Sequence, residues 1–231
     1  MTTTVFTDTV TLTAASWFND ADDSIYSGLT GPAGTNTITA TGPANFAYTS
    51  LKIVRWIPAG TNTGATTLNI TPSGSSALGA KNVFFNGVAC VGGEIKSGVP
   101  VQAVYDGTQF QLLHQGYSST YTPTLSAGVN VAASTMRVTG YMRVMDFVFV
   151  AGNLDIDVTT GAPTATSFEI TLPVASNIAN IFDVGGTMTS TTANSAGSIF
   201  GSVGNNTAVF SYSAAVTANE TIAFHFGYRV I

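Results

Sequence analysis

Apolar and polar residues alternate in short runs along most of the chain, with the period of two that half-buried β-strands require. The clearest case is 99–113, "VPVQAVYDGTQFQLL", in which two alternating runs flank Asp106 and Gly107. An Asp-Gly pair accepts the positive φ angles of a type I′ turn, so the pattern predicts a tight antiparallel hairpin that serves as scaffold. The pairs expected across a two-residue loop are Tyr105 with Thr108, Ala103 with Phe110, and Val101 with Leu112.

Further runs of β-branched and aromatic residues lie between segments rich in Gly, Pro, Asn, Ser and Thr, which is typical of an all-β sandwich or barrel. We expect helix only within 16–29, "SWFNDADDSIYSGL", for a turn or two. The other strands are expected in "LKIVRWI", "TTLNI", "NVFFNGVACV", "YMRVMDFVFVAG", "NLDIDVTT", "SFEITLP", "SIFGSV", "TAVFSYSAAV" and "TIAFHFGYRVI".

Two of the later strands have informative faces. In 141–150 the side chains of Phe147 and Phe149 point one way, whereas those of Val144, Val148 and Val150 point the other. A strand that is apolar on both faces fits a sandwich whose outer sheet meets a neighbouring subunit. The last strand is a core strand, because one face carries Ile222, Phe224, Phe226, Tyr228 and Val230.

The polar segment 114–123, "HQGYSSTYTP", marks a boundary between two β modules. We expect a first module over 31–117, which contains the hairpin at 99–113, and a second over 118–231. Both are expected to be antiparallel and sandwich-like or jelly-roll-like.

Composition adds a prediction about assembly. Only 8% of the residues are charged, against roughly 25% in an ordinary globular protein. The surface must therefore be built from Thr, Ser, Asn, Gly, Ala and apolar residues, which is tolerable where it lies against other subunits. The low content of charged residues therefore predicts that the chain forms an obligate oligomer.

The charge pattern and the cysteine count exclude several classes of function. The formal net charge is −5 and the seven basic residues are scattered, which argues against binding of nucleic acid through its phosphates. The start "MTTTVFTDTVTL" has no secretory signal, and no apolar run is long enough for membrane insertion. Cys90 stands alone, so no intramolecular disulfide forms, and its setting favours an inert buried thiol.

Candidate catalytic and metal-binding patterns are weak. Asp155 and Asp157 share one strand face at roughly 7 Å, a spacing that suits glycosidic acid–base chemistry, although alternation with apolar residues favours the solvent side of an outer strand. The run "NDADDS" begins like a calcium loop, but Ile25 replaces the required glycine and Gly31 the bidentate Glu, so N-capping is favoured. His114 and His225 have no zinc or triad pattern around them. We therefore predict no catalytic residue, metal or cofactor.

Tyrosines near turns are the candidates for binding sugar. An aromatic face can stack on a weakly hydrated sugar ring, although packing is the commoner role of such side chains. The candidates for glycan contact are Tyr117, Tyr121 and Tyr212.

Three segments resemble parts of tailed-bacteriophage fibres. The segment 66–113, "TTLNITPSGSSALGAKNVFFNGVACVGGEIKSGVPVQAVYDGTQFQLL", resembles a module of tail-fibre and related virion proteins. The opening 11–29, "TLTAASWFNDADDSIYSGL", resembles the short virion-attachment start of such fibres. The last module, from "YTPTL" through "YMRVMDFVFVAGNLDID" to "FHFGYRVI", is similar to compact distal β-domains of phage fibres and head-decorating fibres.

The resemblance implies a non-enzymatic virion structural protein, a short homotrimeric fibre. Residues 1–30 would form an attachment segment that docks onto another virion protein, such as a tail adaptor, a portal-proximal protein or a capsid protein. The distal module would adhere to glycan on the host surface, with avidity from several copies. The attachment residues would be Trp17, Phe18, Asn19, Asp20 and Tyr26.

Two alternatives stay open. A capsid decoration or cement protein would clamp capsid subunits without binding a receptor. A glycan depolymerase would use Asp155 and Asp157 on host polysaccharide.

Overall fold

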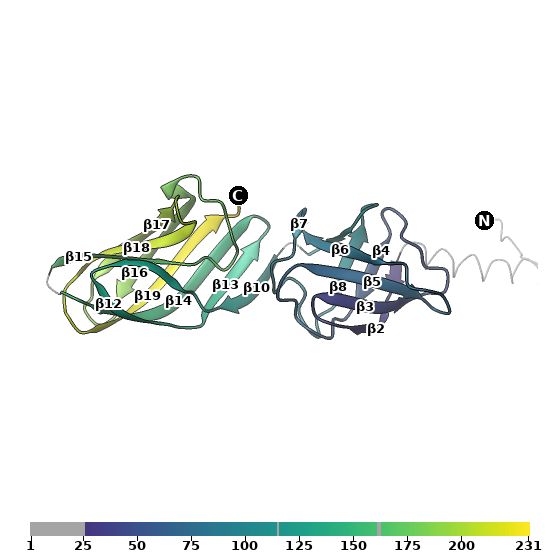
Figure 1. Ribbon diagram of the computed structural model, residues 1–231, viewed down its shortest axis with the longest axis horizontal. Helices are drawn as coiled ribbons and strands as arrows, with labels where there is room; N and C mark the ends of the chain where they lie inside the picture. Colours follow the sequence, from purple (N-terminus) through teal and green to yellow (C-terminus); the bar gives the residue numbers. More distant parts are fainter. Residues whose placement is uncertain (1–25, 115, 161–162) are drawn as a thin grey trace, which may run out of the picture. The chain divides into compact units, whose positions relative to one another are not determined.

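The computed structural model describes residues 26–114, 116–160 and 163–231. The chain divides into two compact units, 1–115 and 116–231, so the observed boundary lies two residues before the one expected at 117 and 118. Both units are all-β, as predicted (Figure 1). Residues 26–28 form a strand of the first unit's sheet, so the end of the segment expected at 1–30 belongs to that unit.

The first unit contains a nine-stranded curled sheet over its described residues, in the order β1-β4-β8-β9-β6-β5-β3-β2, with β7 paired to β6. The prediction of a purely antiparallel module is wrong here, because β1 with β4, β3 with β5, and β6 with β9 pair in parallel. The strands are β1 (Tyr26–Gly28), β2 (Thr30–Ala33), β3 (Thr37–Gly42), β4 (Ile53–Trp56), β5 (Thr66–Pro72), β6 (Ala80–Phe85), β7 (Val88–Ala89), β8 (Val101–Tyr105) and β9 (Phe110–Leu112).

The hairpin around Asp106 is present, but its register is shifted by two residues. Tyr105 lies opposite Phe110 and Ala103 opposite Leu112, so the loop has four residues instead of two. The Asp106 carboxylate explains the wider loop, because its Oδ1 accepts hydrogen bonds from the backbone N–H groups of Thr108 and Gln109, each at 2.9 Å. A shift of two keeps every side chain on its expected face, and the apolar face is buried as predicted.

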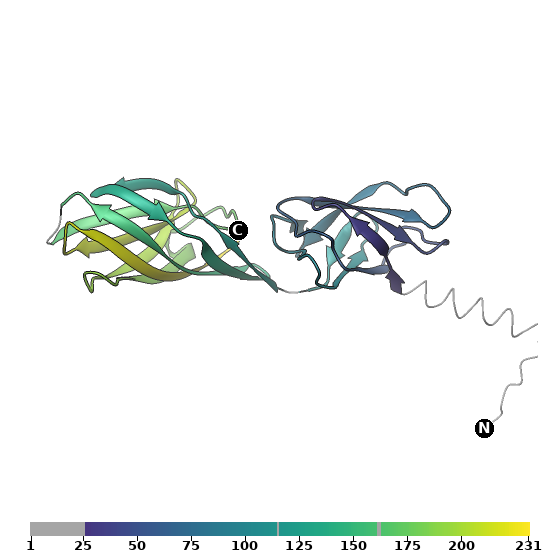
Figure 2. The same cartoon turned by 90° about the horizontal axis from the view of Figure 1, so that it is seen from below.

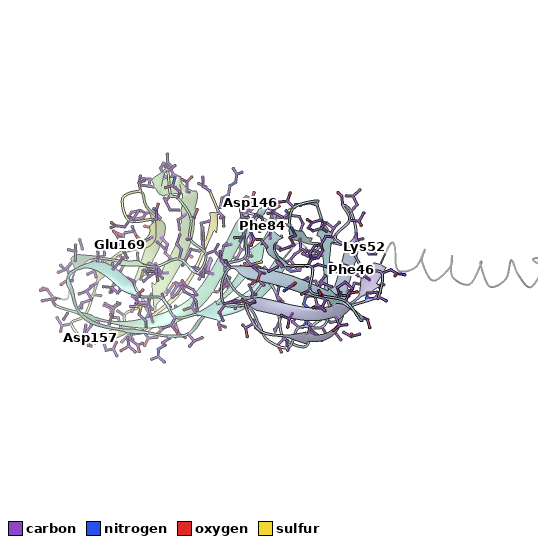
Figure 3. All side chains as sticks on the ribbon, turned by 45° about the vertical axis from the view of Figure 1, so that its right-hand side comes forward. Phe46, Lys52, Phe84, Asp146, Asp157 and Glu169 are labelled. Carbon is purple, nitrogen blue, oxygen red and sulfur yellow. The ribbon has the colours of Figure 1, made fainter. Side chains whose placement is uncertain are left out.

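An aromatic cluster fills the end of the first unit's core beside this hairpin. The Tyr48 ring stacks on Tyr105 at 5.2 Å and meets the Phe110 ring edge-on at 5.6 Å. The Lys52 ammonium lies 5.2 Å from the centre of the Phe46 ring, and both side chains are labelled in Figure 3. The Lys81 ammonium lies 5.7 Å from the centre of the Tyr48 ring, so these two lysines cover aromatic surface as well as carrying charge.

The second unit is antiparallel throughout its described pairs, as predicted. Its ten-stranded curled sheet has the order β10-β13-β14-β19-β16-β17-β18-β15-β11, with β12 paired to β14, and Figure 2 shows these strands wrapping around an interior. A single turn of 3-10 helix, η1 (Ile181–Asp183), precedes β16. The strands are β10 (Gly116–Tyr121), β11 (Leu125–Val129), β12 (Val131–Met136), β13 (Thr139–Val144), β14 (Phe147–Val158), β15 (Thr164–Ile170), β16 (Val184–Ser190), β17 (Ala196–Ser202), β18 (Thr207–Ala214) and β19 (Asn219–Arg229).

The run "YMRVMDFVFV" is a hairpin and not the single strand that its alternation predicts. The chain reverses at Met145 and Asp146, where Met145 has a φ of +52°, and Val144 lies opposite Phe147. Directly opposed residues share a sheet face, so Val144 is exposed beside Phe147 instead of lying with Val148 and Val150. Met-Asp is not a common turn pair, so the sequence carries no turn signal at this position.

The last strand confirms its predicted face. Ile222, Phe224, Phe226 and Tyr228 are all buried, and alternate residues from Ala223 to Arg229 face outward. Around the inward face the Phe210 ring stacks on Phe168 at 4.7 Å and meets Phe224 edge-on at 5.1 Å. Aromatic pairs therefore form the centre of the second unit's core.

Candidate functional site

The predicted attachment residues fall almost entirely beyond the described part of the chain. Trp17, Phe18, Asn19 and Asp20 lie outside the described residues. Tyr26 begins β1, where it is in register with Ile53 of β4. Their role in attachment remains a prediction.

The three tyrosines named as glycan contacts lie in different surroundings. Tyr117 and Tyr121 are half-buried on β10, and each ring meets the Tyr141 ring edge-on at 6.0 Å. The expectation that Tyr212 is exposed is wrong, because it is only 6% exposed and packs in the core. A ring enclosed in the core cannot offer a face to a sugar, so only Tyr117 and Tyr121 remain as predicted contacts.

Asp155 is engaged by other side chains and does not form an open carboxylate pair. Arg137 forms a salt bridge to its Oδ2, and the Thr221 hydroxyl donates to its Oδ1 at 2.8 Å. These hydrogen bonds, that of Arg137 above all, hold the pKa of Asp155 below its usual value. Asp155 alternates with the core residues Leu154 and Ile156 as predicted, but its side chain is only 10% exposed because neighbouring side chains cover it. Asp157 is half-buried on the same strand and is labelled in Figure 3.

The remaining candidate chemistry has structural roles. His225 Nε2 lies 3.3 Å from the Thr187 hydroxyl, and the His114 ring stacks on Phe85 at 5.3 Å. Cys90 is buried, as expected, and is not part of a disulfide. Within the described ranges no group of three His, Cys, Asp or Glu side chains is placed to hold a metal ion, and no helix there has the length and apolar character needed to cross a membrane.

The feature of the second unit that calls for an explanation is its outer sheet face. We define this face by four side chains on the β13–β14 hairpin, next to β19 and β16. Each is between 41% and 54% exposed, so roughly half of its surface meets water. Fully burying one such side chain is worth about 1.5–3 kcal/mol, so the face represents a large unrealised gain. The four residues are Met142, Val144, Phe147 and Phe149.

A groove of about 670 Å³ runs across this sheet beside Phe149. Its floor is made of small residues on four adjacent strands, and Met142, Phe149 and His225 rise from its sides. Gly140 lies opposite Ala151, and Gly185 lies opposite Gly227, so the bulk that normally covers a sheet is missing at these positions, which leaves the hollow. The floor residues are Gly140, Ala151, Gly185, Gly186 and Gly227.

A second hollow of about 420 Å³ adjoins the groove and shares Phe149, Gly185 and Gly227 with it. Phe182 of η1 borders it and is 83% exposed, the largest exposure of any large apolar residue in the described chain. Arg229 and Asp183 border the same hollow. The face is thus apolar with one cation and one carboxylate at its margin.

The first unit contains a buried polar clasp that sequence reasoning missed. Glu94, 3% exposed, accepts hydrogen bonds from Asn62 Nδ2 at 2.8 Å, the Val91 N–H at 2.7 Å and the Gly92 N–H at 2.8 Å. Asn62 Oδ1 in turn accepts from the Ile95 N–H at 2.8 Å. The clasp ties two loops together. No local motif announces it, since Asn62 and Glu94 are 32 positions apart.

The second unit has a buried carboxyl group that, among the described residues, lacks hydrogen bonds of this kind. Glu220 is 0% exposed, and neither of its oxygens has a hydrogen-bond partner among the described residues. The nearby Tyr212 hydroxyl is also buried and has no hydrogen-bond partner in the described part of the chain. Burial, with a smaller contribution from Glu220, raises the pKa of Tyr212. Alternation along β19 places Glu220 on the inward face, a signal present in the sequence although the predicted face began only at Ile222.

No family model matches this chain, and no curated protein and no solved structure matches it either. Function must therefore be argued from the geometry above and from the resemblance of the sequence.

Proposed function

We propose that this chain is a non-enzymatic structural protein of a bacteriophage virion, a short homotrimeric fibre that is anchored by its N-terminal segment and adheres to host glycan through its second unit. The outer sheet face carries the proposal. A sheet that exposes Met142, Phe147 and Phe149 together is the surface of a subunit in an assembly, because exposed apolar patches of this kind mark protein contacts.

Two further observations support an assembling protein over an enzyme. The carboxylate with the best catalytic prospects, Asp155, is occupied by Arg137 and Thr221. The low content of charged residues suits a protein whose copies lie against one another, since interface cores are depleted of charge. Adhesion by such a trimer works through avidity, in which weak binding by each copy is multiplied on one particle.

Light scattering on the purified full chain tests the assembly. We expect a mass of about three times 23.7 kDa, and we expect Phe149→Ser to lower it while leaving the far-ultraviolet circular dichroism unchanged. Val138→Ser is the matched control, because Val138 is 70% exposed in the same unit but lies off this face. A wild-type mass of a single chain would overturn the proposal.

Location and ligand are tested on the particle. Electron microscopy of virions labelled with an antibody to the second unit should place the label on fibres. Label spread over the capsid shell would favour a decoration protein instead. Release of reducing sugar from host polysaccharide by the wild type, abolished in Asp155→Asn with Asp157→Asn, would favour a depolymerase and contradict the proposal.

A further inference from the structure

The glycines in the floor of the groove divide into two kinds. A Cβ at Gly186 would lie 2.3 Å from the His225 carbonyl oxygen, so the packing of this chain itself requires that glycine. A Cβ at Gly185 would have nothing within 4 Å, and one at Gly140 would meet its nearest atom only at 3.8 Å. Neither has a positive φ angle. The folded chain therefore has room for a side chain at Gly185 and at Gly140.

A glycine inside a strand weakens the strand, and it often marks a place where a ligand or another backbone comes close. Gly185 and Gly140 lie within β16 and β13, and neither is explained by a turn, a bulge or a contact within the chain. Both line the groove. We take them as evidence that the groove is shaped for something that enters it.

Phe182 supplies a matching projection. Its ring is 83% exposed, yet its backbone is held firmly in η1 by a capping box. The Asn180 side chain accepts the Phe182 N–H at 3.0 Å, and Asp183 Oδ2 accepts the N–H groups of Ala179 at 2.9 Å and Asn180 at 2.7 Å. A large apolar ring on a pre-organised turn loses little entropy when it is buried, which is the property of an interface anchor.

Two charged side chains at the margin of the face, Arg229 and Asp183, complement the fit of the Phe182 ring to the groove. The Arg229 side chain has no carboxylate within salt-bridge distance among the described residues. Asp183 directly follows Phe182 in the chain. A ring that enters the groove from another copy would bring a carboxylate toward this guanidinium, and Arg pairs with carboxylates in a well-defined geometry.

We propose that the groove receives the Phe182 ring of a second copy of this chain, and that Arg229 then pairs with the partner's Asp183. The proposal rests on the self-assembly in the proposed function and names the contact that produces it. Phe182 borders the hollow that adjoins the groove of its own copy, and the contact is heterologous when each copy gives its ring to one neighbour and receives the ring of another. Heterologous contacts close into a ring when the rotation fits, which suits a trimer.

Two variants test the contact from its two sides. Phe182→Ser removes the projection, and Gly185→Leu fills the groove at a position where the chain itself leaves space. Each should weaken self-association at least about thirtyfold, as expected for loss of an interface anchor. Val138→Ser should leave self-association unchanged. If the wild type is trimeric and both variants remain trimeric at the same concentrations, the contact is wrong although the fibre assignment stands.

Cysteine cross-linking identifies the two partners directly. Chains carrying Phe182→Cys and chains carrying Gly185→Cys, with different tags, are co-expressed and oxidised; the native Cys90 is buried and stays out of reach. We expect a species of twice 23.7 kDa that contains both tags, at a higher yield than either variant forms alone. Cross-links confined to pairs of the same variant would overturn the proposal, and a monomeric wild type would overturn it together with the proposed function.

Discussion

The two units expose large apolar side chains in different ways. In the first unit they stand apart at turns and strand ends, as at Leu51, Ile57 and Leu78. In the second unit Met142, Val144, Phe147 and Phe149 share one sheet face, and two of them, Met142 and Phe149, line the groove. Scattered exposure is ordinary on a protein surface, whereas a contiguous face indicates a partner. The comparison therefore favours the second unit as the site of the proposed assembly.

The two units also differ in how their buried carboxyl groups are hydrogen-bonded. Glu94 of the first unit is buried and meets three donors, whereas Glu220 of the second is buried and meets none among the described residues. The second unit also buries more phenols. Burial raises the pKa of Tyr121, Tyr212 and Tyr228 well above the usual value, whereas in the first unit only Tyr48 among the described residues shows a raised pKa.

The largest effect expected from this difference in tyrosine burial is a loss of stability of the second unit at alkaline pH. A phenol whose pKa is raised by folding stabilises the protein fully below its unfolded pKa of about 10, and this stability is lost as the pH rises from there toward the folded pKa. At about pH 11 each such phenol costs about 1.4 kcal/mol, so three of them destabilise the second unit by about 4 kcal/mol. The first unit loses no more than about a third of that.

Urea unfolding at about pH 8 and about pH 11 measures this loss. Trp56 is buried in the first unit, so in a Trp17→Phe background its fluorescence follows the first unit while circular dichroism follows both. The dichroism transition should gain a component at lower urea when the pH is raised, and the fluorescence transition should move less. An equal shift of the two signals would remove the contrast between the units.

The next largest effect is on the clasp of the first unit. Glu94→Ala leaves three donors without their acceptor, one buried and two half-buried, and we expect a loss of about 2–4 kcal/mol in the free energy of unfolding. Tryptophan fluorescence during urea unfolding measures the loss. The matched variant Glu94→Gln keeps one carbonyl oxygen and should lose less. A loss below about 1 kcal/mol for Glu94→Ala would mean that the clasp is not a structural element.

Alternation predicted the all-β class, the strands richest in large apolar residues, the inward face of β19 and the burial of Phe110, because period-two patterns report directly on burial. It missed the strands built mainly from small and polar residues, namely β1, β2, β3, β10, β11, β12 and β16. It failed where a side chain or a turn overrode the pattern. The Asp106 carboxylate widened its loop through hydrogen bonds that a turn-type rule does not contain. Met145 reversed the chain without Gly or Asn, so one expected strand became two.

The candidate interaction face could be predicted only in part. The exposed apolar side of 147–149 follows from alternation and was tied to a neighbouring subunit on that basis. The groove could not be predicted, because it requires glycines from β13, β16 and β19 to lie side by side, and strand order in an antiparallel sheet is a long-range property. The clasp of Glu94 and the isolation of Glu220 depend on the same kind of long-range contact.

The smallest expected effect on stability concerns the buried carboxyl group of the second unit. Glu220→Leu replaces a buried group that has no partner with an apolar side chain of similar size, and we expect the free energy of unfolding to rise by about 1–3 kcal/mol. Tyr212→Phe removes the neighbouring hydroxyl and should stabilise the unit by less. Urea unfolding followed by circular dichroism measures both.

The double variant decides how these two groups are related. If the Glu220 carboxyl and the Tyr212 hydroxyl are both unpaired, the gains from Glu220→Leu and Tyr212→Phe should add to within about 0.5 kcal/mol. If the two groups instead form a hydrogen bond with each other in solution, either single variant leaves the remaining group buried without a partner. Each single variant should then lower the free energy of unfolding, and the double variant should restore it. Additive stabilisation would show that the second unit tolerates an unfavourable carboxyl in its core, the reverse of the stabilising role that Glu94 has in the first.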